Sequence, residues 1–151
     1  MNVPQQERTP TWYGVFTEKG EASDVMQFLW SGNWPKNKAP YLYSLKVNNK
    51  KAIDDIYLSP GENYSAIAVA ADPDNDKLVY RRELIPEPTQ LSTGGDFEAR
   101  PKSIDGLVTP GDNGNATFKT PDKEGAYRLF VYIMDGNNNV ATANVPFYIK
   151  K

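Results

Sequence analysis

The chain has 151 residues, enough for one domain with a substantial hydrophobic core. Its 17 basic and 19 acidic residues are interleaved and leave a net charge of −2, so no basic stripe favours nucleic-acid binding. Histidine and cysteine are both absent, which excludes imidazole or thiol catalysis, zinc sites built from these residues, and disulfides.

The sequence gives no sign of membrane contact. No apolar run approaches the roughly 18 residues that a membrane-spanning helix needs. No charged-then-apolar signal peptide opens the chain, and we expect any leader to lie elsewhere in a longer protein. We expect a monomer that binds neither nucleic acid nor membrane.

Residues 1–39 are predicted to form an N-terminal segment with one helix and a linker. Apolar residues at positions 22, 25, 26, 29 and 30 follow the i, i+3, i+4, i+7 spacing of an amphipathic helix. Gly32 supplies a helix stop, and Pro35 and Pro40 bound the linker that follows.

Residues 40–151 are predicted to form an immunoglobulin-like antiparallel β-sandwich, so the expected fold class is all-β with a short N-terminal helical segment. The hydrophobic period changes to two, and turn residues separate about seven strands. Those strands are predicted at 41–47, 53–58, 64–71, 78–85, 116–120, 126–134 and 140–149. Tyr127, close after Gly125, resembles a tyrosine corner, whose hydroxyl ties down the preceding turn.

Three aspartates at alternate positions, Asp72, Asp74 and Asp76, form the sharpest local pattern in the chain. In a sandwich of this order their loop lies at the same end as the last hairpin loop, which begins with Asp135. Calcium prefers several oxygen ligands and tolerates irregular geometry, so these four residues are candidate calcium ligands. The EF-hand spacing is missing. The alternative is a turn in which the aspartates bond their own backbone.

Five aromatic residues are candidates for stacking on sugar rings: Trp12, Trp30, Trp34, Tyr41 and Tyr43. Trp30 fits the apolar face of the predicted helix, which favours packing against the sandwich. Trp34 lies beside a proline in the linker and is the best candidate for partial exposure. The alternative is that most of these rings are core or interdomain contacts.

Glycoside hydrolysis would require a pair of carboxylates, and the chain has several acidic residues near its long loop. Glu83, Glu87, Asp96 and Glu98 lie near a long loop, and two of them could be ~5 to 9 Å apart. No pattern places any of them in a cleft, and scattered surface carboxylates are usually solvated charges. The chain is therefore not expected to be an enzyme.

Two stretches resemble the tail of the TIM-barrel catalytic domain of certain bacterial glycoside hydrolases. They read QERTPTWYG at 6–14, similar to the end of the eighth strand, and DVMQFLWSGNWP at 24–35, similar to the closing helix. The Ig-like module appended to such barrels resembles AADPDNDKLVY at 70–80, GGD at 94–96 and GAYRLFVY at 125–132. The aspartate-rich loop is also similar to polycystic-kidney-disease (PKD)-type and cadherin-like sandwiches.

The resemblance implies a non-catalytic, carbohydrate-binding accessory module of a secreted polysaccharide-degrading glycoside hydrolase. It implies an extracellular or periplasmic bacterial protein whose partners are its parent catalytic domain and a plant cell-wall or β-glucan polysaccharide. The sequence departs from the pattern at Arg82, where such sandwiches often carry tryptophan, and the other seven barrel strands are missing. Two alternatives stay open: a structural spacer without a ligand, and a calcium-dependent adhesion-type domain.

Overall fold

One helix and eight strands make up the part of the chain described by the computed structural model, residues 18–88 and 101–151. Helix α1 spans Glu21–Ser31. The strands are β1 (Tyr41–Val47), β2 (Tyr57–Leu58), β3 (Asn63–Ala71), β4 (Val79–Pro86), β5 (Val108–Pro110), β6 (Asn115–Lys119), β7 (Gly125–Met134) and β8 (Val140–Ile149). Within these residues α1 is too short to cross a bilayer.

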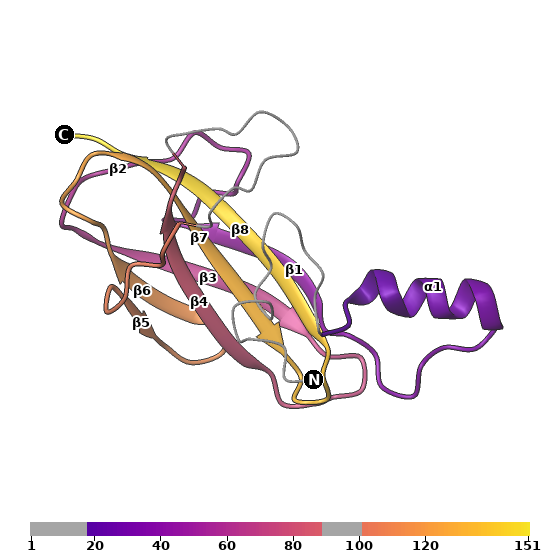
Figure 1. Ribbon diagram of the computed structural model, residues 1–151. Coiled ribbons are helices and arrows are strands. Elements are labelled where there is room, and N and C mark those ends of the chain that lie inside the picture. The colour runs from indigo at the N-terminus through magenta and orange to yellow at the C-terminus, as the bar shows by residue number, and fades with distance from the viewer. Residues whose placement is uncertain (1–17, 89–100) are drawn as a thin grey trace.

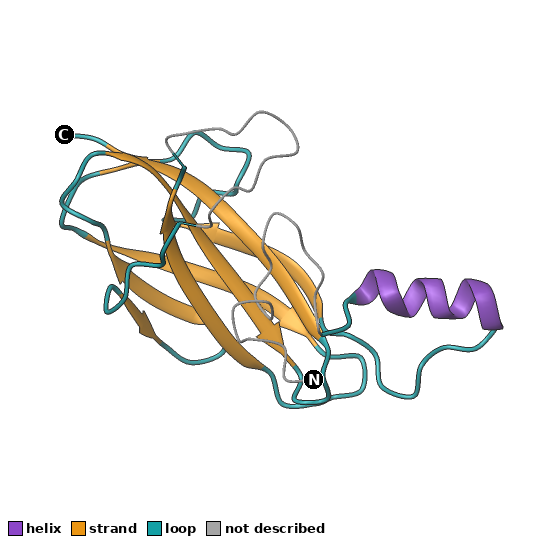
Figure 2. Cartoon of the chain, in the orientation of Figure 1, coloured by secondary structure: helices purple, strands orange, loops and turns teal. Residues whose placement is uncertain are grey.

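The strands form two four-stranded sheets that pack face to face (Figures 1 and 2). One sheet has the order β1-β3-β6-β5, and the other has the order β2-β8-β7-β4. All neighbours are antiparallel except β2, which pairs in parallel with β8. The predicted all-β, immunoglobulin-like sandwich is confirmed.

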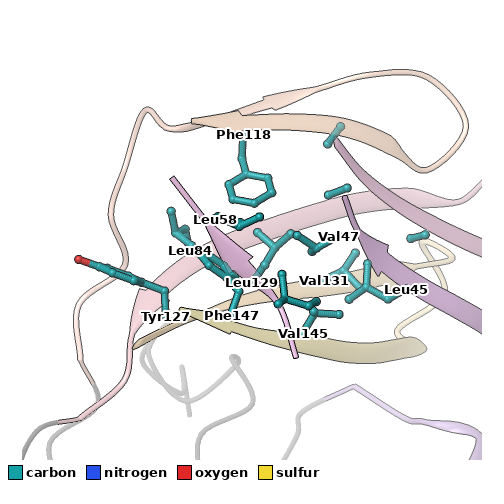
Figure 3. Close-up of a cluster of buried hydrophobic side chains, with 14 of the residues drawn as sticks. Leu45, Val47, Leu58, Leu84, Phe118, Tyr127, Leu129, Val131, Val145 and Phe147 are labelled. Atoms are coloured by element: carbon teal, nitrogen blue, oxygen red, sulfur yellow. The ribbon is translucent and has the colours of Figure 1, made fainter. Parts of the chain in front are cut away.

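The core lies between the sheets and is built largely from alternate residues of the strands. On β7 the inward side chains include Leu129, Val131 and Ile133, all fully buried. Phe118 of β6 and Phe147 of β8 meet across the core with ring centroids 5.5 Å apart (Figure 3). The predicted alternation of residues 64–70 is also confirmed, because side chains at even positions of β3 contact this core. Burial of this apolar surface is the main stabilising contribution to the domain.

Strand β1 breaks the regular alternation that the sequence predicts for it. Leu42 pairs with Ala70 and Ser44 with Val69, so Tyr43 is an extra residue in a β-bulge. The bulge changes the phase of the strand: Leu42 packs on the core before it and Leu45 after it. Tyr43 is therefore 68% exposed, although a regular strand would place it on the same face as Leu45.

One predicted strand boundary is also wrong, and one strand was not predicted. The strand expected at 53–58 begins only at Tyr57, because residues 51–54 form a turn in which Asp54 accepts a hydrogen bond from the backbone N–H of Lys51 (2.7 Å). Strand β5 lies in a stretch with weak strand signal; its partner β6 fixes it, with Val108 opposite Phe118.

Arg82 lies where sandwiches of this type often carry tryptophan, and it joins the two sheets. Its guanidinium donates a hydrogen bond to the backbone carbonyl of Gly114 (2.7 Å) and lies over the ring of Tyr80, 5.4 Å from the centroid. Burial lowers the pKa of this guanidinium. Gly114 has a left-handed φ of 80°, and a Cβ there would lie 2.2 Å from the carbonyl oxygen of Ala68. The tight approach of strands at this point therefore requires glycine.

The predicted tyrosine corner is present. Tyr127 is buried, and its hydroxyl donates a hydrogen bond to the backbone carbonyl of Lys123 (2.9 Å), fixing the turn before β7. Burial raises the pKa of this phenol above its ordinary value of 10.0.

Helix α1 extends away from the sandwich as an arm (Figure 1). It ends as predicted, at Gly32 in the left-handed conformation (φ 73°), whose N–H bonds the carbonyl of Phe28 (2.8 Å). The prediction that Trp30 packs against the sandwich is wrong, because Trp30 is 80% exposed. The buried core cluster of the sandwich contains no residue of the helix, so Trp30 is not part of that core.

Candidate metal centre

Two loops at one end of the sandwich bring three carboxylates together. Strands β4, β7 and β8 are neighbours in one sheet, with Val79 opposite Met134 and Met134 opposite Val140. The loop before β4 and the loop between β7 and β8 therefore lie side by side. Carboxylate oxygens of Asp72, Asp76 and Asp135 are all within 4.8 Å of one another.

Each loop is held by an aspartate that binds its own backbone. Asp72 Oδ1 accepts hydrogen bonds from the N–H groups of Asp74 (2.8 Å) and Asp76 (3.1 Å). Asp135 Oδ1 accepts them from Asn137 (2.7 Å) and Asn139 (3.1 Å). These are the side-chain-to-backbone turns of the alternative interpretation, and they preorganise the carboxylates.

One buried carboxylate oxygen in the centre takes no part in the hydrogen bonds of these turns. Asp72 Oδ2 is buried and has no hydrogen-bond partner among the described residues. A buried carboxylate oxygen without a partner is unfavourable, and an ion bound beside it is one of the accepted explanations. With two further carboxylates within 4.8 Å, a cation would also relieve the repulsion among three negative charges.

The donor set indicates which kind of cation fits. The three candidate ligands are carboxylates, and the chain has no histidine or cysteine to add softer donors. Oxygen-only sites suit hard cations such as calcium and magnesium rather than zinc or copper. Asp72, Asp76 and Asp135 would therefore be the ligands of such an ion.

Asp74, the fourth candidate ligand, is not in this group. Its Oδ2 accepts a hydrogen bond from the backbone N–H of Lys38 (2.6 Å), and its side chain is exposed. Asp74 therefore ties the loop to the linker that follows α1.

Asn37 in the same linker forms a third wall of the centre, which the sequence did not indicate. Its Nδ2 donates to Asp76 Oδ2 (2.5 Å), and its Oδ1 accepts from Asn139 Nδ2 (2.5 Å). Asn139 is buried and also donates to Asp135 Oδ2 (2.6 Å). Asn137 Nδ2 adds a second donor to Asp76 Oδ2 (2.8 Å). No local pattern marks Asn37, because its partners are 39 and 102 residues away.

Both ends of the arm are fastened close to this centre. Before α1, the backbone N–H of Lys19 donates a hydrogen bond to the carbonyl of Asn138 (2.9 Å), and the carbonyl of Lys19 accepts one from the N–H of Val140 (2.8 Å). After α1, the N–H of Ala39 donates to Asp24 Oδ2 (2.6 Å), a buried carboxylate of the helix itself. The loops that carry the candidate metal ligands thus also determine where the arm leaves the sandwich.

The structure describes four of the five predicted sugar-stacking residues, and they lie on α1, on the linker after it and on β1. Trp34 is partly exposed, as expected, but Phe28 stacks on its ring at 4.6 Å and 12°, and Lys38 Nζ lies 5.7 Å from its centroid. Tyr41 is half-buried on β1, whereas Tyr43 is exposed at the bulge. Trp12 lies outside the described residues.

The acidic residues considered for hydrolysis are engaged elsewhere or lie outside the described residues. Glu83 pairs with Arg81 (2.5 Å) and accepts a hydrogen bond from the hydroxyl of Tyr132 (3.2 Å). Glu87 pairs with Arg128 (2.5 Å). Asp96 and Glu98 lie outside the described residues.

Comparisons with known proteins find likenesses only among solved structures. No family model matches the chain, and no curated protein resembles it significantly. A nucleoside hydrolase-related hypothetical protein from Saccharophagus degradans, associated with carbohydrate metabolism, is 20% identical with a TM-score of 0.49. The likeness covers 85% of this chain but only 30% of that one.

Two complete small domains are similar to a lesser degree. A PKD domain of a peptidase from a Thermoplasmatales archaeon is 19% identical over 76% of this chain and 99% of its own, with a TM-score of 0.46. The copper resistance protein PcoC from Escherichia coli is 18% identical over 73% of this chain and 99% of its own, with a TM-score of 0.42. Likenesses at this level assign neither a family nor an activity to the chain.

Proposed function

We propose that this chain is a non-catalytic accessory module of a secreted polysaccharide-degrading glycoside hydrolase, and that arm α1 docks the module onto the parent catalytic domain. The observation that carries the proposal is the exposed apolar surface of α1 beside a sandwich whose own core is complete. An extracellular or periplasmic location belongs to the same proposal.

The arm has the composition of an interface. Val25, Met26, Phe28, Leu29 and Trp30 are all exposed on 11 residues of helix. A helix of this length is marginally stable in water unless its apolar face is packed. Contiguous exposed apolar surface on a soluble domain is typical of a protein interaction site.

The resemblance of residues 24–35 to the closing helix of a glycoside hydrolase barrel supports a catalytic domain as the occupant. A closing helix packs its apolar side against its own barrel, which accounts for an apolar face that the sandwich leaves uncovered. The parent enzyme would supply the catalytic carboxylates.

We further propose that the metal centre binds calcium and holds the arm at a fixed angle. The buried Asp72 oxygen and the all-carboxylate donor set support a hard cation. Asn37 and Asp74 connect the centre to the linker, so an ion there would stiffen the junction between module and enzyme. A calcium-stiffened junction is also the feature that the adhesion-type alternative requires.

The docking proposal is tested in a protein that contains both the module and the catalytic domain. Leu29→Glu places a charge on the arm, and we expect it to speed limited proteolysis of the linker and to lower the melting temperature of the whole enzyme. Ile53→Glu is the control, because Ile53 is also apolar and is even more exposed than Leu29 (90% against 67%) but lies on the sandwich, outside the arm. Equal behaviour of the two variants would show that α1 has no docking partner.

Polysaccharide binding is a second candidate function, supported by the exposure of Trp30 and Tyr43. Retention of the chain on insoluble β-glucan, xylan or mannan tests it, with a chelator added to detect any dependence on calcium. Trp30→Ala and Tyr43→Ala would each weaken retention if these rings stack on the sugar.

A further inference from the structure

A pair of exposed tyrosines lies at the edge of the sandwich far from the arm. Strand β2 pairs in parallel with the end of β8, which puts Tyr57 directly opposite Tyr148 (Figure 1). Their ring centroids are 6.4 Å apart with an interplanar angle of 62°. The residues are 54% and 44% exposed, so they are presented to solvent rather than packed into the core.

A shallow groove of about 300 Å³ runs beside these rings. Its walls come from the turn before β2 and from the ends of β7 and β8, and they include Ile53, Asp54, Asp55, Ala126, Pro146 and Tyr148. The groove is open and presents apolar and carboxylate side chains together, so a ligand with both apolar and hydroxyl groups could contact both.

The polar groups of the groove are acceptors of hydrogen bonds. The Asp55 carboxylate is exposed and has no partner among the described residues, and Asp54 accepts from the backbone of Lys51. Glu87 is already paired with Arg128. Carboxylates accept strong hydrogen bonds from hydroxyl groups and repel anionic ligands.

The Asp54 and Asp55 carboxylates would attract a cationic ligand, but the Tyr57 ring beside them does not favour one. Lys150 Nζ lies 3.7 Å from the ring centroid of Tyr57, so the ring surface that would attract a cation already has one. Tyr148 lines the groove and is 44% exposed, so part of its ring is open to a ligand there. Aromatic rings with adjacent acceptors suit the CH faces and hydroxyls of a neutral sugar.

We propose that this groove is a binding subsite for a neutral sugar residue of a polysaccharide, with Tyr148 stacking on the ring and Asp55 accepting its hydroxyls. The inference rests on the polysaccharide-binding role proposed above but moves it from the predicted tryptophans to the opposite end of the module. Docking through α1 and sugar binding would then be compatible, because they use different ends. A single stacking contact gives weak binding, effective through its linkage to the enzyme.

The test is affinity electrophoresis of the whole chain in gels containing barley β-glucan, xylan or galactomannan. We expect retardation in at least one gel and at least a tenfold weaker affinity for Tyr148→Ala and Asp55→Asn. Tyr148→Phe keeps the ring and should retain binding, which separates loss of stacking from loss of folding. Circular dichroism melting of each variant checks the fold, and a chelator should have no effect.

Several results would overturn the subsite. If Trp30→Ala or Tyr43→Ala abolishes retention while Tyr148→Ala preserves it, polysaccharide binding stands but this groove is not its site. If no neutral glycan retards the wild-type chain, both the subsite and the polysaccharide-binding role fail, while arm docking is unaffected. Retention only by polygalacturonate, or binding only of oligolysine, would contradict a neutral ligand.

Discussion

Leucine side chains have opposite environments in the arm and in the sandwich, as Leu29 and Leu129 show. Leu129 of β7 is fully buried between the sheets, whereas Leu29 of α1 is 67% exposed. Both belong to regular elements with a clear apolar pattern. The sandwich thus buries an apolar core of its own, while the apolar residues of the arm are exposed, and we propose that the catalytic domain covers them.

The largest loss of stability should come from a substitution in the buried core of the sandwich. Leu129→Ala would remove side-chain packing from the centre of the core and destabilise the chain by about 2 to 5 kcal/mol. Urea unfolding followed by circular dichroism measures this loss. A loss below 1 kcal/mol would mean that the sandwich core is far looser than its burial indicates.

Gly114→Ala should be nearly as damaging, by about 3 kcal/mol. It combines an unfavourable left-handed conformation with a clash against the main chain of Ala68. Gly106→Ala is the matched control, since Gly106 has a φ of 77° but no atom within 4 Å of the added methyl group. The control should lose only about 1 to 2 kcal/mol, and equal losses would remove the clash from the explanation.

Calcium should stabilise the end of the sandwich from which the arm leaves. At 100 times its dissociation constant, a bound ion would add about 2.7 kcal/mol to the free energy of unfolding. For a chain of this size that raises the melting temperature by about 2 to 4 °C per kcal/mol. Scanning calorimetry with calcium and with chelator measures the shift.

Asp72→Asn should remove most of the calcium response, because it neutralises the carboxylate that bears the unpartnered oxygen. Asp112→Asn, an exposed change away from the acidic group, should respond to calcium like the wild type. If millimolar calcium does not change the melting temperature of the wild-type chain, the centre binds no calcium. The aspartates would then serve only to accept backbone hydrogen bonds in their turns.

Tyr127→Phe should destabilise the chain by about 1 kcal/mol, because the hydrogen bond to Lys123 is lost. The folded state raises the pKa of Tyr127, so above pH 10 the unfolded chain loses this proton first and the folded chain loses stability. The wild type should therefore lose more stability than Tyr127→Phe between pH 9 and about pH 11. Parallel pH dependence of the two proteins would contradict the burial of this phenol.

The smallest effect should be Leu29→Ala in the isolated chain, within about 0.5 kcal/mol, because an exposed side chain loses little packing. The same substitution should destabilise the docked module in the whole enzyme. A large loss in the isolated chain would mean that the arm packs against the sandwich.

The fold class, the helix and most strands could be predicted from the sequence, because hydrophobic periodicity and turn residues are properties of short segments of the chain. The strand order also predicted that the loops carrying Asp72, Asp76 and Asp135 meet at one end, but the sequence could not show that Asp74 lies outside the group. The β-bulge at Tyr43, strand β5 and the role of Asn37 depend on partners far along the chain, so only the tertiary structure decided them. The exposure of Trp30 also depends on the tertiary structure. An amphipathic pattern predicts that a helix has an apolar face, but the packing of the other elements determines whether that face is covered.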